Sequence, residues 1–248
     1  MFKLAKLTKR TYSEAIRQVM LHNGYFAPLK LIYKEIWKYK DISKIKGKTP
    51  NYTIQERVQR DPQFTRIGLG IYALTDYLSK LKQTETPKNK KEKTEFRHTK
   101  IQGMLLEIGS VEQYDTYTPD RSKKFDGKPL NAISTLKECP NFTFKEIINH
   151  SVKYIDVIWF NERSFPCRVF EVEDSTDFRG AFVKFTELQD FMTQFSIIAP
   201  ETREEKYQRE IRKKAFKNIK ERCKFISYGV VEEYYQAVLN YDKAKKLF

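Results

Sequence analysis

The first eighty residues follow a helical pattern that gives way to a strand-like one. Apolar side chains recur at helical spacing in three stretches, residues 11–20, 29–37 and 50–60. The next stretch, FTRIGLGIYAL, has two strand-like arms around Gly68 and Gly70 and predicts a hairpin with a glycine-rich tip. Three helices followed by a hairpin is the order of a winged helix-turn-helix domain, which we expect over residues 1–82.

The last 150 residues alternate between buried-strand and helical patterns. Apolar, β-branched and aromatic runs predict strands at 154–160, 167–172, 195–199 and 225–228. Amphipathic or strongly charged stretches predict helices at 101–108, 144–150, 175–192, 201–220 and 231–239. Strands that alternate with helices indicate an α/β domain with a mixed sheet, which we expect over residues 101–248.

Residues 83–100 separate these two regions and contain few large apolar side chains. The stretch is rich in lysine and offers no material for a core, so it predicts a basic linker that is flexible or extends the following helix. His98 lies within it and is expected to be exposed and without a chemical role.

Charge and composition narrow the function. The 248 residues carry 47 Lys and Arg against 32 Asp and Glu, a formal net charge of +15. Such an excess favours a polyanionic partner, most commonly nucleic acid, although a basic surface also serves solubility. The sequence contains no run of eighteen apolar residues, no secretory signal and only three scattered cysteines, which predicts a cytoplasmic protein with reduced thiols. Motifs of hydrolase triads, zincins and P-loop enzymes are absent from the sequence.

Acidic residues gather where two predicted strands meet. Asp156 lies in the first strand, whereas Glu171 and Glu173 lie two positions apart in the second and should share a face. Buried strands seldom carry unpaired carboxylates, because burying a charge is costly. A cation that prefers oxygen ligands would hold the three acids together, and Mg²⁺ is the first candidate. A solvated strand edge with ordinary surface acids is the alternative.

These acids resemble the PD-(D/E)XK core of many restriction endonucleases, in which an aspartate precedes a strand that ends in Glu-x-Lys or Glu-x-Glu. The segments FEVEDSTDFRGAFVKFTELQDF, IIAPETREEKYQREI and CKFISY resemble the later blocks of one restriction-enzyme-like group. Two positions depart from the pattern, because Ile155 replaces the proline and Glu173 replaces the usual lysine.

The resemblance assigns roles to individual residues. It implies that Asp156 and Glu171, with the backbone carbonyl of Val172, hold one or two Mg²⁺ ions, with Mn²⁺ as a substitute and Ca²⁺ as a non-productive occupant. It further implies that Glu173 orients or deprotonates the attacking water and that Glu107 is an additional acid of the site. Lys184 is the candidate to replace the missing lysine, with a surface pair to Glu187 as the alternative.

The N-terminal segments GKTP, YTIQERVQRD and FTRIGLGIYAL resemble the HARE helix-turn-helix domain over about residues 11–77. HARE domains are regarded as DNA-binding and occur fused to restriction endonuclease domains, so the resemblance makes residues 50–60 a recognition helix. The candidates for DNA contact are Lys48, Thr49, Asn51, Tyr52, Gln55, Arg57 and, in the wing, Arg66. Ordinary solvated helix residues are the alternative, and some winged helices bind only protein.

Together these features predict a sequence-specific double-stranded DNA endonuclease of the type II restriction kind, dependent on Mg²⁺, in a prokaryotic cell. A homodimer is expected, because a double-strand cut needs two active sites or two visits, and a cognate DNA methyltransferase is expected in the host. Two alternatives stay open: a DNA-binding regulatory protein with an inactive nuclease-like domain, and a nuclease of repair or modified DNA.

Overall fold

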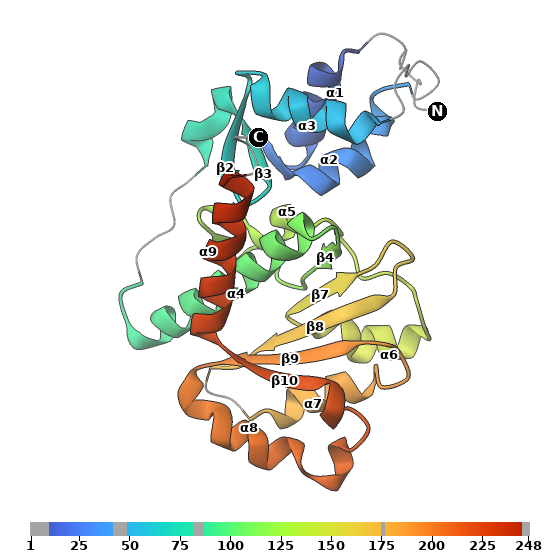
Figure 1. Cartoon of the computed structure of the whole chain (residues 1–248), viewed down its shortest axis with the longest axis vertical. Coiled ribbons are helices and arrows are strands. Elements are labelled where there is room, and N and C mark those ends of the chain that lie inside the picture. Colours follow the sequence, from blue (N-terminus) through green and yellow to red (C-terminus); the bar gives the residue numbers. More distant parts are fainter. Residues whose placement is uncertain (1–9, 42–48, 82–86, 175–176, 245–248) are drawn as a thin grey trace. The chain divides into compact units, whose positions relative to one another are not determined.

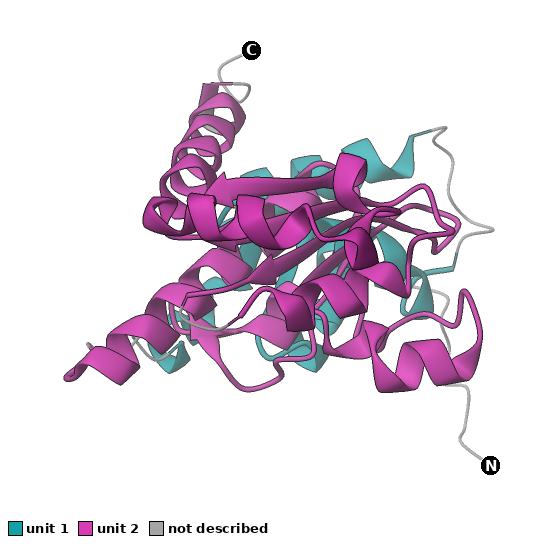
Figure 2. Ribbon diagram, turned by 90° about the horizontal axis from the view of Figure 1, so that it is seen from below, with its two compact units in different colours: residues 1–82 teal, residues 83–248 magenta. Residues whose placement is uncertain are grey.

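The computed structural model of the protein forms two compact units, residues 1–82 and 83–248 (Figure 2). It describes residues 10–41, 49–81, 87–174 and 177–244. No helix within these ranges is both long and apolar enough to cross a membrane.

The first unit combines helices with a small antiparallel sheet. Its helices are α1 (Tyr12–His22), α2 (Leu29–Glu35) and α3 (Pro50–Arg60), with 3₁₀ turns η1 (Ile36–Lys38) and η3 (Thr75–Lys80). Its strands are β1 (Phe26–Pro28), β2 (Phe64–Gly68) and β3 (Ile71–Leu74), arranged in the order β1-β3-β2. The predicted hairpin is therefore present as β2 and β3, and β1 adds a third strand.

Local signals fix the helices of this unit. Thr11 caps α1 in a reciprocal pair with Glu14, which satisfies amide groups that the first turn leaves without partners. The apolar residues at helical spacing are buried, among them Ile16, Ile54 and Val58. Burial of these side chains against the sheet is what stabilises the unit, because isolated helices of this length are marginal.

The second unit contains the remaining elements. Its helices are α4 (Lys90–Val111), α5 (Leu130–Ile133), α6 (Lys145–His150), α7 (Arg179–Thr186), α8 (Glu204–Ile211) and α9 (Tyr228–Ala244), with 3₁₀ turns η4 (Val152–Tyr154), η5 (Glu201–Arg203), η6 (Lys214–Phe216) and η7 (Lys220–Arg222). Its strands are β4 (Asp115–Tyr117), β5 (Lys124–Phe125), β6 (Lys128–Pro129), β7 (Val157–Phe160), β8 (Pro166–Val172), β9 (Gln194–Ala199) and β10 (Cys223–Ser227).

A five-stranded mixed sheet organises this unit (Figure 1). The strand order is β10-β9-β8-β7-β4, in which β10, β9 and β8 run parallel while β7 is antiparallel to both β8 and β4. The α/β class and the mixed sheet predicted from the sequence are thus confirmed.

The two faces of this sheet are covered by different helices. On one face the aromatic side chains of α7 and Tyr207 of α8 pack against Val169, Phe195 and Ile197 in one apolar core. On the other face α4 lies against the sheet, where Trp159 Nε1 donates a hydrogen bond to Leu105 O at 3.1 Å. Contact here is so close that a Cβ on Gly109 would lie 2.6 Å from the Trp159 ring, so this position requires glycine.

Of the two alternatives left open for the basic linker, the structure shows an extension of the following helix for residues 90–100. Residues 90–100 form the first half of α4, and Asn89 caps this helix through a hydrogen bond from the Glu92 amide. The lysines lie on the exposed side, whereas Thr94 and His98 are half-buried and Thr99 is buried. A stretch that is polar in composition therefore still has an inward face.

Two predicted helices are shorter than expected. The helix at 175–192 is described only as α7, and the one at 201–220 is helical only over α8. After α8 the backbone of Lys213 becomes extended, and two 3₁₀ turns then bury Phe216 and Ile219 against the sheet. The chain therefore buries Phe216 and Ile219 through these two turns and does not continue as one helix.

Candidate active site

A cleft of about 510 Å³ opens at the end of strands β7 and β8, between α4 and α7. Its lining includes acidic, basic and imidazole groups: His98, Lys123, Asp156, Glu171, Glu173 and Lys184.

The antiparallel pairing of β7 and β8 brings two of the predicted acids together. Val157 pairs with Phe170, so Asp156, just before β7, lies beside Glu171 near the end of β8. Asp156 Oδ2 accepts a hydrogen bond from the Val172 amide at 2.8 Å, which fixes the carboxylate to the neighbouring strand. Glu171 is 2 % exposed and Asp156 is half-buried. Glu173 follows β8 directly and lines the same cleft.

Lys184 neutralises part of this charge. Its Nζ lies 2.6 Å from each carboxylate oxygen of Glu171 and donates a further hydrogen bond to Tyr154 O at 3.2 Å. The helix α7 is therefore placed so that it contributes a lysine to the cleft. Lys184 thus pairs with Glu171, and the alternative of a surface pair with Glu187 does not describe its main contact.

Burial and mutual repulsion raise the pKa values of both glutamates. For Glu171, burial and then the charge of Asp156 raise the pKa well above its ordinary value, and Lys184 offsets only part of this effect. For Glu173, burial and then Asp156 raise the pKa to about 7, while Lys184, Arg203 and His98 lower it. These carboxyl groups therefore lack sufficient positive charge in the described part of the chain.

Glu107 does not belong to this cleft. Nine positions separate it from His98 on α4, about two and a half turns, so the two side chains lie on opposite faces of the helix. Glu107 is 0 % exposed, lies 3.1 Å from Lys128 Nζ and accepts a hydrogen bond from the Tyr235 hydroxyl at 2.7 Å. Its prediction as a catalytic acid is therefore wrong in position, because it forms a buried ion pair between α4, β6 and α9.

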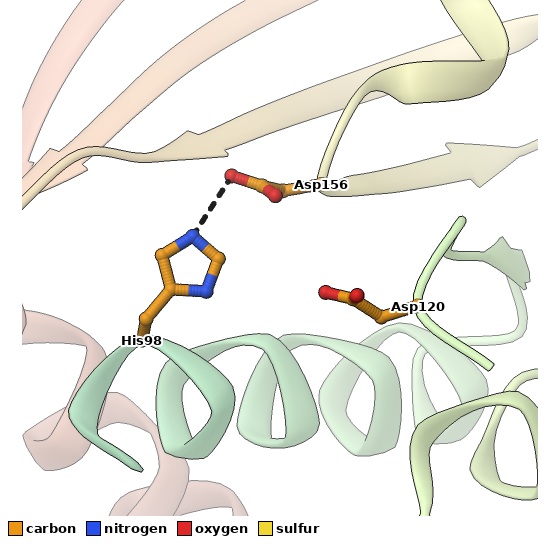
Figure 3. Close-up of side chains that lie close together, drawn as sticks. All are labelled: His98, Asp120 and Asp156. Carbon is orange, nitrogen blue, oxygen red and sulfur yellow. Dashed lines mark ion pairs between the residues drawn. The ribbon is translucent and has the colours of Figure 1, made fainter. Parts of the chain in front are cut away.

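His98, in contrast, lines the cleft, and the expectation that it is exposed is wrong. Figure 3 shows its ring directed toward Asp156. Its Nε2 lies 3.4 Å from Asp156 Oδ2, and its side chain is 20 % exposed. Burial lowers the pKa of His98, but hydrogen-bonding contact with Asp156 and the charge of Asp156 outweigh this and raise it above the ordinary value.

Two further residues of the site were not predicted. Gln102, one helical turn after His98, donates Nε2 to Asp156 Oδ1 at 3.0 Å and to Asp120 Oδ2 at 3.1 Å. Ligand atoms of His98, Asp120 and Asp156 lie within 4.8 Å of one another. Within the described ranges, these three side chains form a group compact enough to hold a metal ion. Glu171 and Glu173 line the same cleft but do not belong to this group. The i, i+4 spacing of His98 and Gln102 was the signal in the sequence that these two side chains share one face of a helix.

The residues predicted to contact DNA lie in the first unit. On α3, Asn51, Tyr52 and Arg57 are exposed, whereas Gln55 is half-buried and accepts a hydrogen bond from the Tyr33 hydroxyl at 3.4 Å. Thr49 is the N-cap residue of α3, but its side chain makes no capping hydrogen bond.

Arg66, the arginine predicted to lie in a wing, contacts its own hairpin. Arg66 is half-buried, and its Nε donates to Gly68 O at 2.9 Å, which orders the hairpin and limits its reach toward a partner. Lys48 lies outside the described residues.

Chemically, the cleft combines carboxylates that are short of counter-charge with a lysine and an imidazole. Carboxylate oxygens suit hard divalent cations, and a carboxyl group with a pKa near 7 can accept a proton at neutral pH. The arrangement is thus equipped to bind a cation and to deprotonate a water molecule.

The chain matches the family model described as "Type II restriction enzyme NmeDI C-terminal domain" over residues 78–246. The comparisons with curated proteins and with solved structures found no match to the chain. The matched region contains the whole cleft and the five-stranded sheet. The chain therefore belongs to the family of the type II restriction enzyme NmeDI C-terminal domain.

Proposed function

We propose that the protein is a Mg²⁺-dependent endonuclease that cuts double-stranded DNA at specific sequences, with a PD-(D/E)XK-type active site. The single observation that carries this proposal is the pairing of Asp156 and Glu171 at the end of adjacent strands, with Lys184 at 2.6 Å from the Glu171 carboxylate. Glu173 stands where the sequence pattern has a lysine, and Lys184 of α7 then takes the role of that lysine. The family match supports a restriction-type nuclease.

The residues present suit a magnesium ion. Glu171 Oε1 is buried and accepts no hydrogen bond of good geometry from any described residue, although the Lys184 ammonium is near. Asp156, Glu171 and the backbone carbonyl of Val172 would hold the ion, and Mn²⁺ would substitute for it, whereas Ca²⁺ would bind without supporting cleavage. When bound, Mg²⁺ supplies Lewis-acid polarisation of the scissile phosphate and lowers the pKa of a water ligand.

The side chains around this ion have separate roles. Glu173, with a pKa of about 7, accepts a proton from the attacking water near neutral pH. Lys184 lowers the pKa of Glu171 in part and adds positive charge beside the phosphate that is cut. Arg203 donates a hydrogen bond to Glu173 O at 2.6 Å and so holds the backbone of the general base in place.

The first unit is proposed as a HARE-type winged helix domain that binds duplex DNA. Its element order, α1-β1-α2-α3-β2-β3, and its antiparallel sheet support this proposal. Exposed Asn51, Tyr52 and Arg57 on α3 are available to base edges or phosphates. A second copy of the chain and a DNA methyltransferase that protects the host sequence are proposed as partners.

One observation keeps a second candidate open, a DNA-binding regulatory protein with an inactive domain. Glu173 stands in place of the lysine, which would weaken catalysis unless Lys184 replaces it. A nuclease of repair or modified DNA would share the same residues.

Cleavage of long unmethylated duplex DNA by the purified full chain tests the proposal. Discrete fragments with Mg²⁺ that disappear with EDTA and with Asp156→Ala are the expected result. Salt-sensitive binding without cleavage, on unmethylated and on methylated DNA, would instead favour the regulatory protein. Cleavage of methylated DNA alone would favour the nuclease of modified DNA.

A further inference from the structure

A second group of metal-ligating side chains lies on the α4 side of the cleft. His98 comes from α4, Asp120 from the segment between β4 and β5, and Asp156 from the start of β7 (Figure 3). All three side chains point toward one another, and their ligand atoms lie within 4.8 Å of one another. Ligands of one divalent ion at about 2.2 Å are at most about 4.4 Å apart, so a few tenths of an ångström of closure would enclose an ion.

The contacts inside this group are loose where an ion would bind. His98 Nε2 lies 3.4 Å from Asp156 Oδ2, longer than the roughly 2.9 Å of a strong hydrogen bond. That oxygen already accepts the Val172 amide at 2.8 Å. His98 Nδ1 is buried and makes no hydrogen bond to any residue in the described ranges. The imidazole therefore lies in a polar site without strong partners.

Gln102 provides an independent sign of a missing ligand. Its side chain is 0 % exposed, its Nε2 lies between Asp120 and Asp156, and its Oε1 is buried without a hydrogen bond to any described residue. Its amide hydrogens separate two carboxylates, as a cation would. A half turn of the amide would bring Oε1 to face the same carboxylates, an arrangement that is favourable only with a cation between them.

We infer that His98, Asp120 and Asp156 form a second divalent-cation site that selects a transition-metal ion such as Mn²⁺ over Mg²⁺. Imidazole nitrogen is a poor ligand for Mg²⁺ and a good one for first-row transition metals, whereas the cluster of Asp156 and Glu171 offers only oxygen. Lys123, 3.2 Å from Asp120 Oδ2, is the group with which the ion competes. This inference rests on the proposed function for the use of the ion in cleavage, but binding itself can be tested without DNA.

Electron spin-echo envelope modulation of Mn²⁺ bound to the full chain, in an excess of Mg²⁺, tests this site. Nitrogen modulation from a directly bound imidazole is expected in the wild type and in the matched control His150→Asn, whose histidine is exposed on α6. The modulation is expected to disappear in His98→Asn, and Mn²⁺ affinity should fall about tenfold or more. Asp120→Asn, which preserves side-chain shape, should lower Mn²⁺ affinity as well.

Glu171→Gln separates this site from the proposed Mg²⁺ site, since it should keep the nitrogen modulation. Wild-type protein without nitrogen modulation, or modulation that persists in His98→Asn, would overturn the inference. Cleavage measured in parallel distinguishes the two proposals. Nitrogen modulation without any cleavage supports this site and contradicts the nuclease, whereas cleavage without nitrogen modulation contradicts this site alone.

Discussion

At the scale of single residues, the cleft is held in an electrostatically costly state. Glu171 is almost fully buried beside Asp156, and Lys184 is its nearest counter-charge. Carboxyl groups in such surroundings bind protons more tightly than in water. Proton uptake and cation binding are therefore competing ways to relieve the same repulsion.

This competition makes stability depend on pH. Glu173 has a pKa of about 7 in the folded protein against an ordinary value of 4.5, so protonation favours the folded state. Its stabilising effect is fully present below the ordinary pKa and is lost as the pH rises through about 7; Glu171 shifts in the same direction. Without metal, the thermal unfolding midpoint should therefore decrease as the pH rises from 5 to 8.

Mg²⁺ should restore much of this loss at pH 8 and little at pH 5, because it binds the ionised carboxylates. Thermal unfolding at both pH values, with Mg²⁺ or EDTA, measures the effect. A Mg²⁺-induced shift of equal size at both pH values would contradict the proposed ligands.

Glu107 lies in a buried ion pair and not in the cleft, so we expect it to contribute to stability. Its pairing with Lys128, 1 % exposed, means that Glu107→Gln leaves a buried ammonium without a full counter-charge. Loss of one partner of a buried pair costs about 3–5 kcal/mol. Urea unfolding should show this loss of stability. The folded Glu107→Gln protein should bind Mg²⁺ as the wild type does. Unchanged stability together with lost Mg²⁺ binding would return Glu107 to the active site.

At the scale of elements, four of the five strands of the mixed sheet were predictable, whereas the edge strand β4 and the helix faces were not. Apolar runs identified β7, β8, β9 and β10, because buried strands have little choice of side chain. The first half of α4 could not be assigned as helix or flexible linker because its lysines dominate the composition, although only one side of the helix faces solvent.

The rotational position of α4 decides which of its residues reach the cleft. The sequence places Glu107 and His98 on opposite faces of one helix, but it does not reveal which face meets the acids. Only packing does, through the close approach of Gly103 to Phe125 and of Gly109 to Trp159. The two acids of the β7–β8 hairpin needed no such information, because strand pairing alone brings them together.

Substitution of these glycines tests that packing. Gly109→Ala should destabilise the protein by about 1–3 kcal/mol, because its Cβ would lie 2.6 Å from Trp159. Gly180→Ala on α7 is the matched control, since a Cβ there meets no atom within 4 Å and alanine favours a helix by up to about 1 kcal/mol. Urea unfolding followed by tryptophan fluorescence compares them. Equal stability of the two variants would contradict the packing of α4 on the sheet.

At the scale of the whole molecule, the two units divide the proposed work. The family match begins at residue 78, so it covers nearly all of the second unit and leaves the first unit almost entirely outside. The net charge of +15 favours a polyanionic partner.

If α3 reads the DNA sequence, its exposed side chains should affect binding selectively. Asn51→Ala should weaken binding to the cleaved sequence by about 1–3 kcal/mol and leave binding to unrelated duplex nearly unchanged. Gln59→Ala, exposed near the other end of the same helix, is the control. Fluorescence anisotropy with both duplexes measures the difference. Equal weakening on both would assign Asn51 to the backbone, and no weakening would remove α3 from the interface.

The central claim is that Asp156 and Glu171 form the catalytic centre of a metal-dependent nuclease, and one matched pair of variants tests it most directly. Glu171→Gln and Glu187→Gln make the same chemical change, the first at a buried cleft position and the second at an exposed position. Cleavage of duplex DNA in Mg²⁺ should fall by at least about 100-fold in the first and remain at the wild-type rate in the second. Cleavage by Glu171→Gln at the wild-type rate would contradict the account.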